Sequence, residues 1–536
     1  MHLNEKPVIQ TTTGKVRGEK RQTVYGDEFY CFDGIPYAKA PIGELRFKAP
    51  LPVERWPGVK DCTQIANKCL QWNRYAQEVQ GSEDCLYLNV YAKNLNSSTR
   101  LPVMVYLHGG GFNTGDATRL SWGPDYFMMK DVVFITIGYR LGLLGFAHFK
   151  DKSLEIPGNA GLKDIILALR WIHDNCENFN GSADNITLFG HSSGSCSTHL
   201  LMLSPSAKGL FHKAILMAGF SMELADIPDL QFRLAKHLGY QGSEDNEKEI
   251  CKFLTEVDYK RLVGFDIWTQ EEKEQNNSYP FMPTLETYID ENSIITDDPV
   301  IMQRHSWSNN IPLMMGCTSS EANIQYKRFA TDESLQYRKY PHYLLPKNLQ
   351  NLKDENLKME LASKFRDLHF GDKPVTIANY QCALENQSYG IYHAQHRILQ
   401  SRLKNSTAST YLYRFDFDSP FFNLYRLKHC GPNVRGVGHV DELSYIFFMP
   451  GSYKLDTTSP EYKCIEQMIE SFYSFAKSSN PTNSKIQPAY WEPVCRTGIP
   501  QCLNISYDST DVINQPEYEK CCVRDELYRM ADIILY

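Results

Sequence analysis

The chain has 536 residues, of which 42% are hydrophobic and 22% charged, an ordinary composition for a large globular protein. Its formal net charge is -7 and its pI is near 6.1, and no basic tract stands out, which argues against a nucleic-acid partner. The sequence contains neither an apolar run of transmembrane length nor a basic start followed by an apolar stretch. We therefore expect a cytoplasmic protein without a transmembrane segment or secretory signal.

The expected elements alternate between short apolar strands and amphipathic helices, which indicates an α/β protein. The expected strands lie at 102–108, 131–139, 185–190, 213–218, 311–316 and 410–417, and the expected helices at 162–175 and 195–203. The more polar stretches 220–300 and 330–400 predict a helical cap. No internal repeat or Gly/Ser-rich linker occurs, so we expect one domain over residues 1–536. The 15 cysteines are scattered without a C-x-x-C pair, and we expect neither a metal nor a cofactor.

One short motif lies between an expected strand and an expected helix: Gly190-His191-Ser192-Ser193-Gly194. G-x-S-x-G in that context is typical of a nucleophile elbow, in which a serine is held on a strained turn. The glycines allow close approach of backbone, and the following helix directs free N–H groups toward developing negative charge. Alone, five such residues also occur by chance.

A second motif, His108-Gly109-Gly110-Gly111-Phe112, directly follows the strand expected at 102–108. Tandem glycines let backbone N–H groups face one point without side-chain interference, as an oxyanion hole requires. We expect Gly110 and Gly111 to donate there, together with the Ser193 N–H. The alternative, a flexible turn, is weakened by the G-x-S-x-G motif downstream.

An elbow serine needs a base, and the base needs an orienting acid. In enzymes that carry such an elbow, the order of these residues along the chain is serine, acid, histidine. Glu321 follows the strand expected at 311–316, and His439 lies in G-V-G-H-V-D-E-L. Both follow Ser192 in the required order, so we assign them as acid and base.

At these residues the chain resembles the type-B carboxylesterase and cholinesterase family, and most closely its insect α-esterase branch. The segments that carry the resemblance are F-D-G-I-P-Y-A-K-A-P from Phe32, E-L-R-F from Glu44, S-E-D-C-L-Y-L-N-V from Ser82, H-G-G-G-F from His108, G-N-A-G-L-K-D from Gly158, A-L-R-W-I from Ala168, G-H-S-S-G from Gly190 and G-V-G-H-V-D-E-L from Gly436. The resemblance implies the α/β-hydrolase fold, with a mostly parallel twisted sheet flanked by helices and helical cap insertions. It places Ser192, Glu321 and His439 on the family's catalytic triad, and Gly110, Gly111 and Ser193 on its oxyanion donors.

The resemblance also implies two structural ion pairs, Arg46 with Glu83 and Arg140 with Asp164. Exposed pairs of this kind contribute only about 0–1 kcal/mol to stability.

The sequence departs from the family pattern around the nucleophile. Many members have G-E-S-A-G, whereas this chain has His191 and Ser193 beside Ser192 and a further serine at Ser195. Because Ser193 would act through its backbone N–H, we expect modest tuning rather than loss of activity.

Two further departures concern the substrate. The Cys69–Cys85 stretch matches the family's first disulfide loop but lacks the tryptophan of cholinesterases, Tyr75 being the nearest aromatic residue, so acetylcholine is a poor candidate substrate. In a reducing cytosol we expect both cysteines to remain thiols. Ala225 falls where many relatives carry an acyl-pocket tryptophan, so Ala225 and Phe112 are expected to line a roomier pocket.

These observations predict a serine carboxylesterase that hydrolyses hydrophobic esters of xenobiotic or lipid type. Organophosphates are expected as covalent inhibitors. The alternatives are a slow-turnover binder that sequesters such esters and a non-catalytic binding protein on the same fold. A hormone esterase or an acylglycerol lipase is a further alternative.

Overall fold

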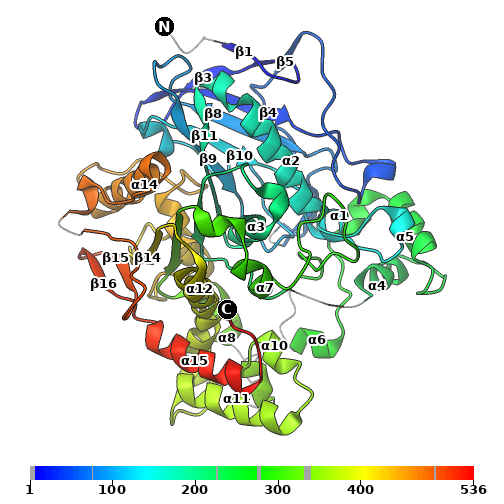
Figure 1. Cartoon of the computed structure of the whole chain (residues 1–536), viewed down its shortest axis with the longest axis vertical. Coiled ribbons are helices and arrows are strands. Elements are labelled where there is room, and N and C mark those ends of the chain that lie inside the picture. Colours follow the sequence, from blue (N-terminus) through cyan, green and yellow to red (C-terminus); the bar gives the residue numbers. More distant parts are fainter. Residues whose placement is uncertain are drawn as a thin grey trace.

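A computed structural model describes residues 6–74, 76–224, 227, 229–274, 279–330, 340–487 and 490–536. Its centre is an 11-stranded sheet that twists through the molecule (Figure 1). In spatial order the strands are β16 (Thr510–Asn514), β15 (Gln501–Ser506), β14 (Thr410–Asp416), β13 (Leu313–Thr318), β12 (Lys213–Met217), β11 (Gly181–His191), β9 (Leu101–Leu107), β10 (Val133–Ile137), β8 (Tyr87–Ala92), β4 (Glu28–Pro36) and β3 (Glu19–Gln22).

The strands from β15 to β10 run parallel, and the strands at both edges are antiparallel to their neighbours. Each of the six expected strands is present, with bounds that differ by a few residues. The edge strands β3, β4, β8, β15 and β16 were not expected. β3 reads Glu-Lys-Arg-Gln, which lacks the apolar pattern that marks a buried strand.

Helices cover both faces of the sheet, because alternate residues of each strand point to opposite sides. On β9, Val103 and Val105 pack with helix α2 (Ala160–Asn175) in one core cluster. Met104 and Tyr106 pack with helix α14 (Pro460–Ser478) in the other. Helix α3 (Ser193–Leu203) follows β11 and lies on the same face as α2 (Figure 1).

The remaining helices lie mostly beyond the carboxyl ends of the central strands (Figure 1). They are α1 (Gly142–Phe146), α4 (Leu230–His237), α5 (Glu247–Glu256), α6 (Gln270–Glu274), α7 (Pro299–Arg304), α8 (Tyr326–Phe329), α10 (Lys347–Gln350), α11 (Glu355–Phe370), α12 (Tyr380–Asn405), α13 (Leu424–His429) and α15 (Tyr518–Met530). The helical prediction holds for α11 and α12, whereas the described part of 220–300 contains only short helices separated by irregular chain.

Two small sheets accompany the main one. β1 (Val8–Gln10), β2 (Lys15–Arg17) and β5 (Val59–Asp61) form the first, and β6 (Gln71–Asn73) and β7 (Glu78–Gln80) the second.

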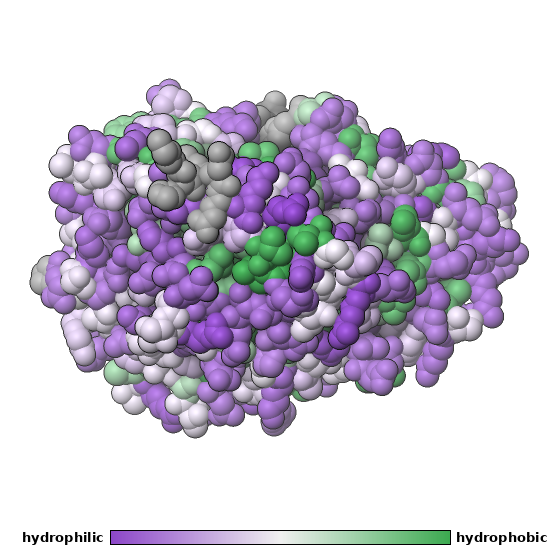
Figure 2. Space-filling view, turned by 90° about the horizontal axis from the view of Figure 1, so that it is seen from above, coloured by the Kyte–Doolittle hydropathy of each residue, from purple (hydrophilic) through white to green (hydrophobic). Residues whose placement is uncertain are grey.

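The face seen from above is largely hydrophilic, with apolar side chains gathered mainly in a patch near its centre (Figure 2). In the described ranges no helix combines the length and apolar composition needed to cross a bilayer.

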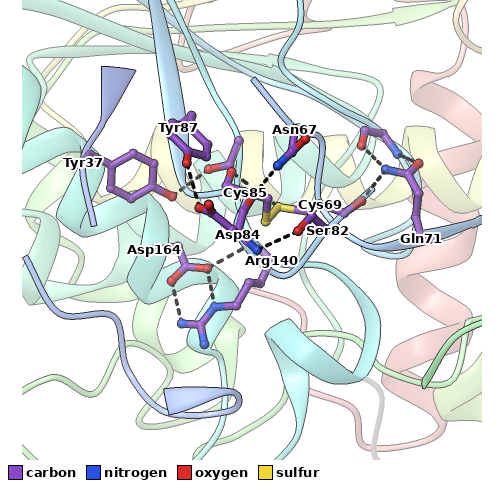
Figure 3. Close-up of a disulfide and its surroundings, with 12 residues drawn as sticks. Tyr37, Asn67, Cys69, Gln71, Ser82, Asp84, Cys85, Tyr87, Arg140 and Asp164 are labelled. Atoms are coloured by element: carbon purple, nitrogen blue, oxygen red, sulfur yellow. Dashed lines mark hydrogen bonds and ion pairs between the residues drawn. A yellow bond between two sulfur atoms is a disulfide. The ribbon is translucent and has the colours of Figure 1, made fainter. Parts of the chain in front are cut away.

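Both expected ion pairs are confirmed, but they are buried rather than exposed. Arg46 Nε donates to Glu83 Oε1 at 2.7 Å, and its NH1 group also donates to three carbonyl oxygens at the end of α5. Arg140 meets Asp164 through two hydrogen bonds of 2.8 and 2.6 Å, and both side chains are inaccessible to solvent (Figure 3). Removing one partner of such a pair leaves a buried charge, which typically costs about 3–5 kcal/mol.

Candidate active site

Ser192 lies on the turn between β11 and α3, with φ 56° and ψ -125°. This left-handed backbone is rare for a residue with a side chain, and such strain persists only where the surroundings enforce it. The two motif glycines show how tight the turn is. A Cβ on Gly190 would lie 2.3 Å from the Gly194 carbonyl, and one on Gly194 would lie 2.1 Å from Leu107 O.

The glycine-rich loop after β9 packs directly against this turn. A Cβ on Gly109 would lie 2.8 Å from His191 O and 3.0 Å from Ser192 Cβ. The two motifs therefore meet in space because β9 and β11 are neighbours in the sheet and both end at this edge.

The conformation of the loop turns its carbonyl groups into local hydrogen bonds. Gly110 has φ +123° and Gly111 has φ +62°. Gly110 O accepts from the Thr114 N–H at 3.0 Å, and Gly111 O accepts from Asn113 Nδ2 at 2.8 Å. Among the hydrogen bonds of the described residues, none is donated by the backbone N–H of Gly110, Gly111 or Ser193. These three donors remain available to a ligand.

Phe112 ends the same loop with φ 60°. Its ring is buried and packs edge-on against Phe146 at 5.3 Å between centroids, and its carbonyl accepts from the Gly142 N–H at 2.7 Å. Ala225 and Tyr75 lie outside the described residues, so the pocket expected around Ala225 stays a prediction.

Glu321 and His439 meet although they come from separate loops. His439 Nδ1 donates to Glu321 Oε2 at 2.6 Å, and the His439 backbone N–H donates to Glu321 O at 3.2 Å. The Thr318 backbone N–H donates to the second carboxylate oxygen, Oε1, at 2.7 Å. Glu321 is fully buried, and both of its oxygens are occupied.

Helix α12 holds the Glu321 turn from behind. Tyr392 donates its hydroxyl to Thr318 O at 2.9 Å, and Ser388 Oγ accepts from the Ala322 N–H at 3.0 Å. These two residues were not singled out in the sequence, because nothing local links a helix near residue 390 to the end of β13.

The atypical neighbours of Ser192 are all buried. Ser195 donates its hydroxyl to Gly219 O at 2.6 Å, so it hydrogen-bonds locally. His191 lies against His439, with ring centroids 4.6 Å apart. Burial lowers the pKa of His191 well below its usual value, and the nearby His439 lowers it further.

Sequence reasoning also missed a buried carboxyl group, Glu442, three residues after His439. Tyr413 donates its hydroxyl to Glu442 Oε2 at 2.9 Å. Burial raises the pKa of Glu442 to about 8, and the charge of Glu321 acts in the same direction. Glu442 lies inside the family segment G-V-G-H-V-D-E-L from Gly436, and this is the feature of the sequence that could have indicated it.

The expectation that Cys69 and Cys85 remain thiols is wrong for this structure, because the two form a disulfide (Figure 3). Their Cα atoms lie 4.9 Å apart, within the range that a disulfide spans. The loop it closes supports the glycine loop, because Gln71 Nε2 donates to Gly115 O at 2.7 Å and Oε1 accepts from the Gly115 N–H at 2.9 Å. The pairing depends on the proximity of the two side chains in the fold, which the sequence does not reveal.

No group of three or more His, Cys, Asp or Glu side chains within the described ranges is arranged to hold a metal ion.

Comparison with known proteins identifies the family of the chain. The model of the carboxylesterase family matches residues 5–523. Esterase B1 of Culex pipiens is 34% identical over 534 residues, covering 98% of each chain. Juvenile hormone esterase of Heliothis virescens is 32% identical over 497 residues, covering 89% of this chain and 86% of that one.

A solved structure, juvenile hormone esterase from Manduca sexta with OTFP covalently attached, superposes with a TM-score of 0.85 at 29% identity. It covers 98% of this chain and 100% of that one, and it supports the predicted α/β-hydrolase fold. The chain therefore belongs to the carboxylesterase family and is a carboxylic ester hydrolase.

Proposed function

We propose that this protein hydrolyses hydrophobic carboxylic esters through an acyl-enzyme on Ser192. The observation that carries the proposal is the 2.6 Å hydrogen bond from His439 Nδ1 to the buried Glu321 carboxylate. This bond leaves His439 Nε2 free to accept the proton of a serine hydroxyl.

In the first half-reaction, His439 takes the Ser192 proton as the oxygen attacks the ester carbonyl. Glu321 stabilises the imidazolium that forms, and the N–H groups of Gly110, Gly111 and Ser193 receive the oxyanion. His439 then returns the proton to the departing alcohol. Water attacks the acyl-enzyme with His439 again as base, and the acid is released.

The position before the nucleophile carries no negative charge that would favour a cationic substrate. The residue before the nucleophile is a buried histidine whose pKa is lowered by burial, so it is neutral at pH 7 and offers no anion to a cationic substrate. The relatives named for juvenile hormone make a lipid-like ester a reasonable member of the substrate class.

The test is a series of chromogenic esters of increasing acyl length, measured with wild type, Ser192→Ala and Ser197→Ala. Ser197 is a matched control, because it is a buried serine on the helix that follows Ser192 and donates to Ser193 O at 3.0 Å. We expect turnover of medium and long acyl esters by wild type and Ser197→Ala, and none by Ser192→Ala. An organophosphate should label Ser192, as located by peptide mass spectrometry. Substantial turnover by Ser192→Ala would refute the acyl-enzyme on Ser192. A preference of wild type for acetyl esters would refute the hydrophobic substrate class.

Slow-turnover sequestration is the competing function, since it would use the same residues. It predicts that one molecule of alcohol per active site is released in a rapid burst, followed by slow deacylation. An esterase with fast deacylation shows a linear time course under the same conditions.

A further inference from the structure

The residue before the nucleophile forms an unusual buried contact. His191 Nε2, at the end of β11, lies 3.8 Å from Glu442 Oε1 in the 3₁₀ helix Asp441–Tyr445. Both side chains are almost completely buried, and neither of these two atoms has a hydrogen-bond partner. A buried polar atom left without a partner is unfavourable, so two such atoms facing each other need an explanation. A movement of about 1 Å would join them in a hydrogen bond.

The same histidine touches the catalytic base. The rings of His191 and His439 lie 4.6 Å apart at an angle of 41°. Glu321, His439, His191 and Glu442 therefore form one continuous row of ionisable groups, with a carboxyl group at each end. The nucleophile turn lies beside the middle of this row, because Ser192 directly follows His191.

Among the described residues no Lys or Arg acts directly on His191 or Glu442, whereas Arg426 on α13 lies beside Asp441, with its Nε 3.9 Å from Oδ2. The titratable groups near it are His439, Glu321, Asp441 in the same 3₁₀ helix, Tyr413 on β14, Tyr106 on β9 and Cys317 on β13. Burial raises the pKa of Glu442 to about 8 and that of Asp441 to about 7, whereas it lowers the pKa of His191. At neutral pH the pair therefore consists of a carboxylic acid and a neutral imidazole rather than an ion pair.

We propose that His191 and Glu442 form a second, buried proton-sharing pair that orients His439 from behind and adjusts how strongly the site stabilises its protonated form. The proposal rests on the proposed function, because it concerns the base of that reaction. His191 and Glu442 are positioning residues, since they act through His439 rather than on the substrate.

The protonation of the pair changes with pH in a defined way. With Glu442 protonated, its hydroxyl faces His191 Nε2 as a donor, and the pair carries no charge. When Glu442 loses its proton to solvent, the His191 proton must occupy Nε2 and point at the carboxylate. The negative charge then stabilises the imidazolium that forms on His439 when Ser192 loses its proton. The rate of the chemical step should therefore rise as Glu442 ionises.

The experiment compares pH profiles of kcat/KM for a chromogenic ester in wild type, Glu442→Gln, Glu442→Asp and His191→Gln. Wild type should show, beyond the ionisation of its base, a second rise of about tenfold near pH 8, the low end of what an opposite charge within about 6 Å contributes. Glu442→Gln should lose this rise, and Glu442→Asp should keep it. In His191→Gln the rise should occur at a different pH. Glu461→Gln is the matched control, because Glu461 is also fully buried, accepts from Ser419 Oγ at 2.9 Å and has one oxygen without a partner.

A measurement without turnover separates this proposal from the proposed function. Infrared difference spectra of wild type minus Glu442→Gln should show the carbonyl stretch of a protonated carboxyl group that disappears as the pH rises from about 6 to about 10. Active-site titration and thermal unfolding confirm that each variant is folded. If an active wild type lacks the second rise, if the rise persists in Glu442→Gln, or if the infrared band does not titrate, the proposal is wrong. Absence of esterase activity in wild type with a titrating band would instead remove the proposed function alone.

Discussion

Replacing Glu321 by glutamine tests the assignment of the acid most directly, because the amide has the same shape but a different hydrogen-bonding pattern. In the structure one carboxylate oxygen accepts from the Thr318 N–H at 2.7 Å, and the other accepts from His439 Nδ1 at 2.6 Å. Each of these two N–H donors therefore has its own acceptor oxygen on Glu321. A glutamine side chain offers only one acceptor oxygen and presents an NH₂ group on the other side.

Either orientation of the amide is unfavourable for catalysis. With its oxygen toward Thr318, the NH₂ group faces His439 Nδ1, which must then become an acceptor, and the proton moves to Nε2. His439 in that tautomer cannot accept the serine proton. With the amide reversed, the NH₂ group opposes the buried Thr318 N–H, at a cost of about 1–3 kcal/mol. The first orientation should dominate.

The expected result is a fall in kcat of about 10⁴, or about 5 kcal/mol of transition-state stabilisation, with KM little changed. Glu321→Asp keeps the charge but retracts it by about 1.5 Å, and we expect a smaller loss of about a hundredfold. The assay is hydrolysis of a chromogenic ester with active sites counted by covalent titration. Glu461→Gln controls for loss of a buried carboxylate elsewhere. Activity of Glu321→Gln within tenfold of wild type would refute the reasoning, provided that Ser192→Ala is inactive.

Further predictions concern the supports of the site. Gly110→Ala should lower kcat at least about a hundredfold in the same assay, because a methyl group at φ +123° would lie 2.0 Å from a neighbouring carbonyl oxygen and displace the oxyanion donors. Arg140→Met should destabilise the fold by about 3–5 kcal/mol in chemical denaturation by leaving Asp164 unpaired, and an effect below about 1 kcal/mol would contradict a buried pair. Cys85→Ser should lower the free energy of unfolding by about 3 kcal/mol, the value for a loop of about 15 residues, and reductant should then have no further effect. Burial lowers the pKa of His199 to about 4, so the unfolded chain, with an ordinary value near 6.5, takes up the proton first. Unfolding free energy should therefore fall as pH drops from about 6.5 to about 4, by up to about 1.4 kcal/mol per unit, and less steeply in His199→Gln.

Local chemistry is enough to single out a candidate nucleophile turn in the sequence. Gly190, Ser192 and Gly194 were recognisable because a strained turn between a strand and a helix demands those residue types in a row. The central strands were recognisable because both faces of a parallel strand are buried, which produces short, uninterrupted apolar runs. Edge strands such as β3 lack that signal, since one side faces water and charged residues are tolerated there.

Tertiary structure decided everything that depends on distance between remote segments. It placed Cys69 within bonding distance of Cys85, and it buried Arg140 with Asp164 where exposure could not be judged from sequence. It also set Glu442 against His191, two residues whose side chains meet only because a loop after β14 folds over the end of β11. The sequence by itself thus determined the type of chemistry, because a nucleophile turn and an oxyanion loop are local patterns. The tertiary structure decided which charges are buried together, because burial and proximity arise only when the sheet brings its strand ends to one edge.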